Sequence, residues 1–107
     1  MNKPVHLRAV AANDIELAVD HYLAETGAEV AARLVDALER DLGKLARQPH
    51  LGSLRFAYEL GIPDLRAWPV QGFPYVVFYV EQDQRLDVWR VLQERRDIPA
   101  SLAPPQG

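Results

Sequence analysis

The residues best suited to acid–base or metal chemistry are scattered along this chain. Its three histidines, His6, His21 and His50, do not fall into a short cluster with the spacing of metal ligands. The closest pairing, His21 with Glu25, has a separation that on a helix is far more often a surface contact than a ligand site. There is no phosphate-binding glycine loop, and cysteine is absent, which excludes thiolate metal sites, cysteine nucleophiles and disulfides. We therefore expect no catalytic residue, no metal site and no cofactor.

The arginines of the last third carry a clearer signal, which is for binding. Arg66 alternates with apolar residues, and Arg90 lies within a later apolar run that Arg95 and Arg96 follow. Strict strand alternation puts Arg90 on an otherwise apolar face, whose other members are Leu86, Val88 and Leu92. Two interpretations stay open: each guanidinium pairs with a carboxylate of this chain, or it binds a phosphate or a partner's carboxylate. For Arg95 and Arg96, the first interpretation requires that Glu94 and Asp97 neutralise the two guanidinium groups.

Two tryptophans add a second binding signal. Trp68 and Trp89 lie in predicted strands, where an exposed pair would mark a partner site. Tyr75, Phe78 and Tyr79 are more typical of the core of a sheet. Packing in the core remains the alternative for at least one tryptophan.

Hydrophobic spacing predicts the helices that position these residues. Residues 5–10 form a short edge strand, and Asn13, with Glu16 three residues later, is typical of a helix N-cap. This first helix should end at Gly27, which can adopt the left-handed conformation. Residues 28–47 carry an apolar stripe at helical spacing, which predicts a second helix. A turn this short between them requires an antiparallel hairpin.

The second half of the chain predicts a sheet. Residues 48–64 contain the prolines and glycines of a long loop, with a helical turn near residues 56–58. Strands at 65–70, 75–81 and 85–93, joined by short turns, form an antiparallel meander. The fold class is therefore α+β: an N-terminal strand and a helical hairpin packed on a small antiparallel sheet. We expect one domain over residues 1–98 and a disordered tail over 99–107.

Composition excludes several classes of function. The 12 lysines and arginines against 15 acidic residues give a net charge of −3, the wrong sign for holding nucleic acid by bulk electrostatics. The longest uncharged stretch, residues 67–80, is too short and too rich in proline and glycine for a membrane helix of about 20 residues. With no signal-peptide pattern, we expect a soluble cytoplasmic protein that does not contact a membrane.

Several segments together resemble the ParE branch of the RelE/ParE toxin superfamily. They are DLRAWPV at 64–70, PYVVFY at 74–79, VWRVLQERRD at 88–97 and the PHLG loop at 49–52. The early helical hairpin, with Asp14, Ile15 and Tyr22, also resembles that branch. The resemblance runs from residue 5 to about residue 98, and its order and spacing are more specific than any single motif.

The resemblance implies the toxin of a type II toxin–antitoxin module. Toxins of this branch inhibit DNA gyrase and are held inactive by an antitoxin, usually with a ribbon-helix-helix, ParD-like, DNA-binding half. DNA is then contacted only through the antitoxin. On this basis we expect Arg66, Trp68 and Arg90 to bind an acidic antitoxin chain laid between hairpin and sheet. We expect Arg95 and Arg96 to engage the target.

The chain departs from the related RelE branch, which cleaves mRNA on the ribosome with basic residues and a terminal Tyr or His. The only lysines, Lys3 and Lys44, lie outside the meander, and Gln93 stands where that branch often has His. Glutamine cannot transfer a proton near neutral pH. We therefore favour a toxin that acts by binding. The alternatives are a ribosome-dependent endoribonuclease and a non-toxic relic that still binds the antitoxin.

Overall fold

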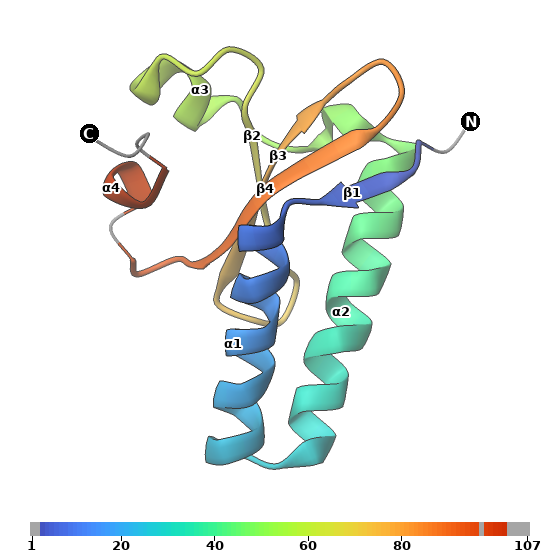
Figure 1. Cartoon of the computed structure of the whole chain (residues 1–107), viewed down its shortest axis with the longest axis vertical. Helices are drawn as coiled ribbons and strands as arrows, with labels where there is room; N and C mark the ends of the chain where they lie inside the picture. The colour runs from blue at the N-terminus through green and yellow to red at the C-terminus, as the bar shows by residue number, and fades with distance from the viewer. Residues whose placement is uncertain (1–2, 97, 103–107) are drawn as a thin grey trace.

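A computed structural model describes residues 3–96 and 98–102 of the chain (Figure 1). The elements in order are β1 (Val5–Leu7), α1 (Ala9–Glu25), α2 (Ala28–Arg47), the 3₁₀ turn η1 (Pro49–Leu51), α3 (Arg55–Leu60), β2 (Arg66–Pro69), β3 (Tyr75–Glu81), β4 (Leu86–Gln93) and α4 (Ile98–Leu102). The predicted α+β class and the order of its elements are confirmed. None of these helices combines the length and apolar character needed to span a bilayer.

One four-stranded sheet, in the order β1-β4-β3-β2, forms the centre of the fold. β2, β3 and β4 pair antiparallel, so the predicted meander is confirmed. β1 is an edge strand, as expected, but it ends at Leu7 instead of residue 10, because Ala9 and Val10 belong to α1. It also runs parallel to β4, with Val5 opposite Leu86 and Leu7 opposite Val88. The sheet is therefore mixed, and β1 covers only the first part of β4's outer edge.

The helical hairpin covers one face of this sheet, while α3 and α4 cover the other (Figure 1). α2 has the bounds that its apolar stripe predicts, and Leu34 and Leu45 are fully buried against the sheet. Gly27 follows the end of α1 and has a positive φ of +103°, as expected of a glycine there, but its ψ of 176° places it outside the left-handed helical conformation. The second layer packs Phe56 edge-on to Phe78, with 5.3 Å between the ring centroids. The sheet thus has apolar residues on both faces.

The start of α1 differs from the prediction. The helix begins at Ala9, and Asn13 lies inside it rather than at its N-cap. The backbone N–H of Arg8 still bonds to the carbonyl of Val88, so the chain passes from β1 into the helix without a loop. This early start buries Ala11 completely, a gain from packing that outweighs the lost side-chain cap.

A β-bulge shifts the alternation in β4. Phe78 pairs with Arg90 but Tyr79 pairs with Val88, so Trp89 is an extra residue in the ladder. Strict alternation cannot reveal such an insertion.

The bulge corrects the predicted face of Arg90. Leu86 and Val88 pack under the helical hairpin, whereas Leu92 packs in the cluster on the opposite face. Arg90 lies opposite Phe78, which belongs to that same opposite cluster. Arg90 and Leu92 therefore do not share a face with Leu86 and Val88.

The C-terminal segment also differs from the prediction. Ile98–Leu102 forms the short helix α4 within the stretch where a disordered tail was expected from residue 99. Ile98 and Leu102, one helical turn apart, are both buried. Pro99 lies in the first turn, where proline is well tolerated. The rest of the expected tail, residues 103–107, lies outside the described residues.

A buried carboxylate fastens β1 to β4. Asp87 is 1% exposed and accepts hydrogen bonds from Arg8 Nη2 (2.9 Å), Arg8 Nε (3.3 Å), Trp89 Nε1 (3.1 Å) and Gln82 Nε2 (3.4 Å). Burial of this carboxyl opposes ionisation, but the hydrogen bonds and charge of Arg8, with Trp89 and Arg85, outweigh it and lower the pKa of Asp87.

This lowered pKa predicts a stability loss at acidic pH. The Asp87 carboxylate contributes stability that is present above its unfolded pKa of about 3.9 and is lost as the pH falls through the lower folded value. We expect Asp87→Asn to cost about 1–2 kcal/mol in free energy of unfolding at pH 7. Urea denaturation should show this difference shrinking below about pH 4. An equal difference at pH 7 and pH 3 would contradict the assignment.

Candidate functional site

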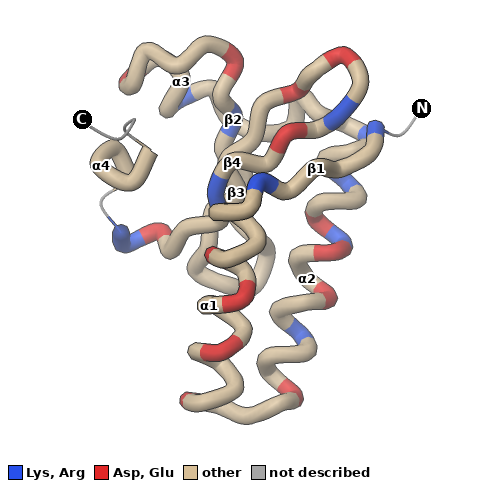
Figure 2. Tube along the Cα trace, viewed as in Figure 1, with Lys and Arg blue, Asp and Glu red and all other residues tan. Residues whose placement is uncertain are grey.

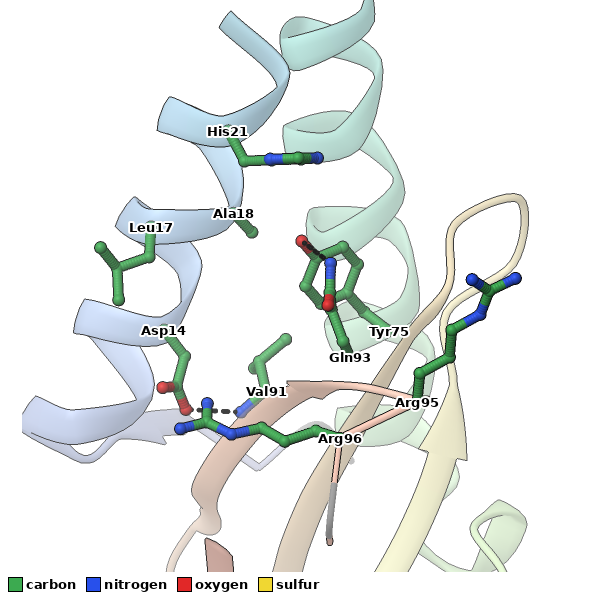
Figure 3. Close-up of a pocket in the computed structure, with 9 residues that line it drawn as sticks. All are labelled: Asp14, Leu17, Ala18, His21, Tyr75, Val91, Gln93, Arg95 and Arg96. Atoms are coloured by element: carbon green, nitrogen blue, oxygen red, sulfur yellow. Dashed lines mark hydrogen bonds between the residues drawn. The ribbon is translucent and has the colours of Figure 1, made fainter. Parts of the chain in front are cut away.

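The main candidate site is a groove of about 450 Å³ between α1 and the end of β4 (Figure 3). We call it the α1–β4 groove. α1 supplies four residues from one flank, because positions three and four apart on a helix lie side by side. The other lining residues come from the start of β3, the end of β4 and the turn that follows. The lining is Asp14, Leu17, Ala18, His21, Tyr75, Val91, Gln93, Arg95 and Arg96.

The groove exists because β1 is shorter than β4. β1 ends at Leu7, opposite Val88, and the outer edge of β4 continues uncovered by a strand. Asp14 Oδ2 accepts the outward N–H of Val91 at 3.0 Å, in place of a neighbouring strand. Glu94 N donates to Pro74 O, so the backbone N–H of Glu94 faces β3. Because successive residues of an antiparallel strand face opposite sides, the backbone N–H and C=O of Gln93 point away from β3. The edge of β4 therefore forms one wall of the groove.

Asp14 and Arg90 form a two-pronged ion pair behind this wall. Arg90 Nε lies 2.8 Å from Asp14 Oδ2, and Arg90 Nη2 lies 2.9 Å from Asp14 Oδ1. The hydrogen bond to Asp14 raises the pKa of Arg90, although burial partly opposes the rise. Arg90 Nη1 also donates to the carbonyl of Ser101 in α4 at 3.1 Å. The interpretation of Arg90 as an internal partner of a helix carboxylate is thus confirmed.

The interior of the groove is mainly apolar. Tyr75 and Val91 are buried, whereas Leu17 is 59% exposed although it is a large apolar side chain. Gln93 Nε2 lies 3.4 Å from the hydroxyl of Tyr75 and closes one end. Leu17 therefore adds exposed apolar area to the concave surface.

Arg95 and Arg96 supply the charge of the groove. Both are exposed, and neither forms an ion pair with another residue in the described ranges. Glu94 does not neutralise them, and Asp97 lies outside those ranges. Figure 3 shows Arg96 extending toward Asp14 while Arg95 points the other way. In Figure 2 the two arginines form a blue segment between β4 and α4.

Arg66 lies elsewhere, on β2, which β3 separates from β4. Its Nη1 donates to the carbonyls of Gly52 (2.8 Å) and His50 (3.2 Å), and its Nη2 lies 3.3 Å from His50 Nδ1. The guanidinium therefore holds the loop after α2 against the sheet.

Trp68, also on β2, is anchored to α2. Its indole Nε1 donates to Asp41 Oδ2 at 3.2 Å, and Lys44 Nζ lies 5.4 Å from the ring centroid. Asp41 is 2% exposed and also accepts the backbone N–H of Gln71. Arg95 and Arg96 thus both line the groove, Arg90 lies behind it, and Arg66 and Trp68 are not among its lining residues.

Several groove residues were missed from the sequence. Leu17 falls outside the apolar stripe of the first helix, which is the one signal that it serves something other than the core. Tyr75 was assigned to the core alone, and His21 was paired with Glu25, an ion pair that does not form among the described residues. Instead the His21 ring packs edge-on to Tyr22, with 5.2 Å between their centroids.

The chemistry of the groove suits recognition of a peptide segment. Asp14 already accepts hydrogen bonds from Arg90 and from the backbone N–H of Val91. The apolar lining can bury side chains of a bound segment, and Arg95 and Arg96 place cations at its rim. Among the described residues, no three of His, Asp and Glu gather into a possible metal site.

The chain is thus a small α+β domain with a groove between α1 and the edge of β4. Its fold is similar to a chain of the solved "Chromosomal ParDE TA system from P. aeruginosa", with a TM-score of 0.71 over 85% of this chain and 95% of that one, at 17% identity. A search of curated proteins found no significant match. The family description "ParE toxin of type II toxin-antitoxin system, parDE" matches residues 5–98. The chain therefore belongs to the ParE toxin family.

Proposed function

We propose that this protein is a toxin that acts by binding DNA gyrase in the cytoplasm and is neutralised by an antitoxin seated in the α1–β4 groove. The observation that carries the proposal is the groove itself, with exposed Leu17 inside it and two arginines without ion pairs among the described residues at its rim. Membership of the ParE family supports the antitoxin as partner, and the gyrase target rests on the resemblance to toxins that inhibit gyrase. Neutralisation then requires no chemical step.

The groove defines the chemistry of the antitoxin segment. Apolar side chains cover Leu17, Ala18 and Tyr75, while carboxylates pair with Arg95 and Arg96. A ribbon-helix-helix, ParD-like half of the antitoxin holds the operator, so DNA is contacted only through the partner. The protein itself, with a net charge of −3, needs no nucleic-acid surface for this role.

The other residues expected to bind antitoxin take supporting roles in this proposal. Arg90 keeps Asp14 and the edge of β4 in position, and so shapes the wall that the antitoxin contacts. Arg66 and Trp68 are half-buried on β2, where a second part of the antitoxin chain reaches them after leaving the groove. The target contact remains with Arg95 and Arg96, and antitoxin and target then compete for the same two guanidinium groups.

Leu17→Glu is expected to weaken antitoxin binding about 10- to 100-fold, since a charge replaces an apolar contact at the centre of the interface. Isothermal titration calorimetry with the co-encoded antitoxin measures the change. Leu23→Glu is the matched control: Leu23 is an exposed leucine of the same helix, 48% exposed, outside the groove. Equal affinities for the Leu17 and Leu23 variants would show that the antitoxin does not bind in the groove.

The double variant Arg95→Glu, Arg96→Glu is expected to lose most of its inhibition of gyrase supercoiling, with at least about a tenfold higher concentration needed for half inhibition. Reversing two charges replaces attraction at the contact by repulsion. Arg33→Glu with Arg47→Glu, two exposed arginines of α2, makes the same change in net charge and should retain inhibition. Loss in both variants would indicate a general charge effect and contradict a local target contact.

A further inference from the structure

A second pocket, of about 450 Å³, lies at the end of α3 and shares no residue with the α1–β4 groove. It is bounded by α3 and by the turn that leads into β2 (Figure 1). Its lining is Leu54, Ala57, Tyr58, Gly61, Pro63 and Asp64. We call it the α3 pocket.

Tyr58 is the first unusual residue of this pocket. Its side chain is 81% exposed, more than any other large apolar or aromatic side chain in the described ranges. α3 is able to bury an aromatic ring, because Phe56 on the same helix packs against Phe78. The Tyr58 ring therefore presents its faces to solvent at the rim of a concave surface.

Asp64 is the second unusual residue of the α3 pocket. Leu65 N donates to Ile62 O, so residues 62–65 form a turn with Pro63 and Asp64 at its centre. Asp64 has φ +64°, the one positive φ among the described residues other than glycine. Glycine or asparagine fits this position better. The Asp64 carboxylate has no ion-pair partner within residues 3–96 and 98–102. An exposed ring and an unpaired acid thus line one pocket.

The chemistry of the α3 pocket selects a cation carried on an apolar stem. Asp64 is the only charged residue of its lining, Tyr58 offers a π face, and Leu54, Ala57 and Pro63 provide apolar walls. Carboxylate and aromatic face both favour a guanidinium or ammonium group, and the walls suit the methylene groups beneath it. The nearby acid Glu59 is paired with Arg55 at 3.2 Å, so Asp64 supplies the free charge.

We propose that the α3 pocket binds an arginine or lysine side chain of a partner protein. This surface is separate from the α1–β4 groove and has the opposite charge preference: the groove presents arginines to an acidic segment, whereas the α3 pocket presents a carboxylate to a basic one. The protein therefore engages two chain segments at once. The inference does not depend on gyrase being the target or on the antitoxin occupying the groove.

The test is an NMR titration of the full chain with an acetylated, amidated Gly-Arg-Gly peptide, compared with the same peptide carrying citrulline. Citrulline keeps the shape of arginine but lacks its charge. We expect amide shifts at residues 57–65 with the arginine peptide and about fivefold weaker binding of the citrulline peptide, the range of an exposed ion pair. Equal binding of both peptides, or shifts elsewhere only, would overturn the proposal.

Two pairs of variants separate a binding role from a structural one. Asp64→Asn suits the left-handed conformation, so we expect no lower thermal midpoint but about fivefold weaker peptide binding. Tyr58→Phe retains the ring and the affinity, whereas Tyr58→Ala loses about two- to fivefold. Unchanged affinity in both Asp64→Asn and Tyr58→Ala would overturn the site. The antitoxin calorimetry measures a different surface, so failure there leaves this result intact.

Discussion

Replacing Asp14 by alanine is expected to lower the free energy of unfolding by about 3 kcal/mol. The substitution removes the acceptor of two Arg90 hydrogen bonds and of the Val91 N–H, and leaves a largely buried guanidinium without its counter-charge. Breaking one side of a buried ion pair costs about 3–5 kcal/mol, and we take the lower end because the Arg90 side chain is 18% exposed. Urea denaturation followed by circular dichroism measures the loss.

Two controls separate the ion pair from helix propensity. Asp20→Ala changes an exposed aspartate of the same helix and should alter stability by no more than about 0.5 kcal/mol. The double variant Asp14→Ala, Arg90→Met should recover part of the loss, because no unpaired charge remains. Similar stabilities for Asp14→Ala and Asp20→Ala would show that the pair does not hold α1 to β4.

Gly52→Ala is expected to destabilise the protein by about 2–3 kcal/mol through a direct collision. A Cβ at this position would lie 2.6 Å from the Tyr79 hydroxyl oxygen, 2.9 Å from Tyr79 Cε1 and 3.0 Å from Arg66 Cβ. Neither neighbour can move freely. Tyr79 is fully buried, and its hydroxyl donates to Pro49 O at 2.7 Å and accepts from Gly52 N at 2.9 Å.

Burial also raises the pKa of the Tyr79 hydroxyl, despite the opposing hydrogen bond from the backbone of Gly52, so it stays a donor at neutral pH. Gly43→Ala is the matched control, since its Cβ would meet only Arg47 Nη1 at 3.7 Å. Within a helix this change should stabilise by up to about 1 kcal/mol. Thermal unfolding of the two variants should therefore move in opposite directions. A Gly52→Ala midpoint close to that of the natural chain would contradict the packing around Tyr79.

Elements with a strong apolar period were predictable from the sequence. α2 was predicted to the residue from its apolar stripe, and β3 was predicted to the residue from a nearly unbroken apolar run between two turns. The bulge at Trp89 was not predictable, since it depends on how β4 registers against β3. α4 was missed for a related reason: a five-residue helix has little period of its own and is stabilised by packing of Ile98 and Leu102.

The groove was only partly visible in the sequence. Arg95 and Arg96 could be selected as exposed cations because they follow the last strand. The wall opposite them comes from α1, and the central contact joins Asp14 to Arg90 across 76 positions of sequence. The groove also depends on β1 ending at Leu7, which leaves the edge of β4 open. A sequence pattern shows neither the pairing nor the length mismatch of the two strands.

We propose that this ParE-family chain inhibits gyrase by binding it, without cleaving RNA. The most direct measurement adds the purified protein to a DNA gyrase supercoiling and cleavage assay, in parallel with a translating extract probed for cuts in mRNA. We predict that supercoiling stops, that the mRNA stays intact, and that an equimolar amount of antitoxin restores supercoiling. Cut mRNA with fully active gyrase would contradict the account and assign the protein to the ribosome-dependent nucleases.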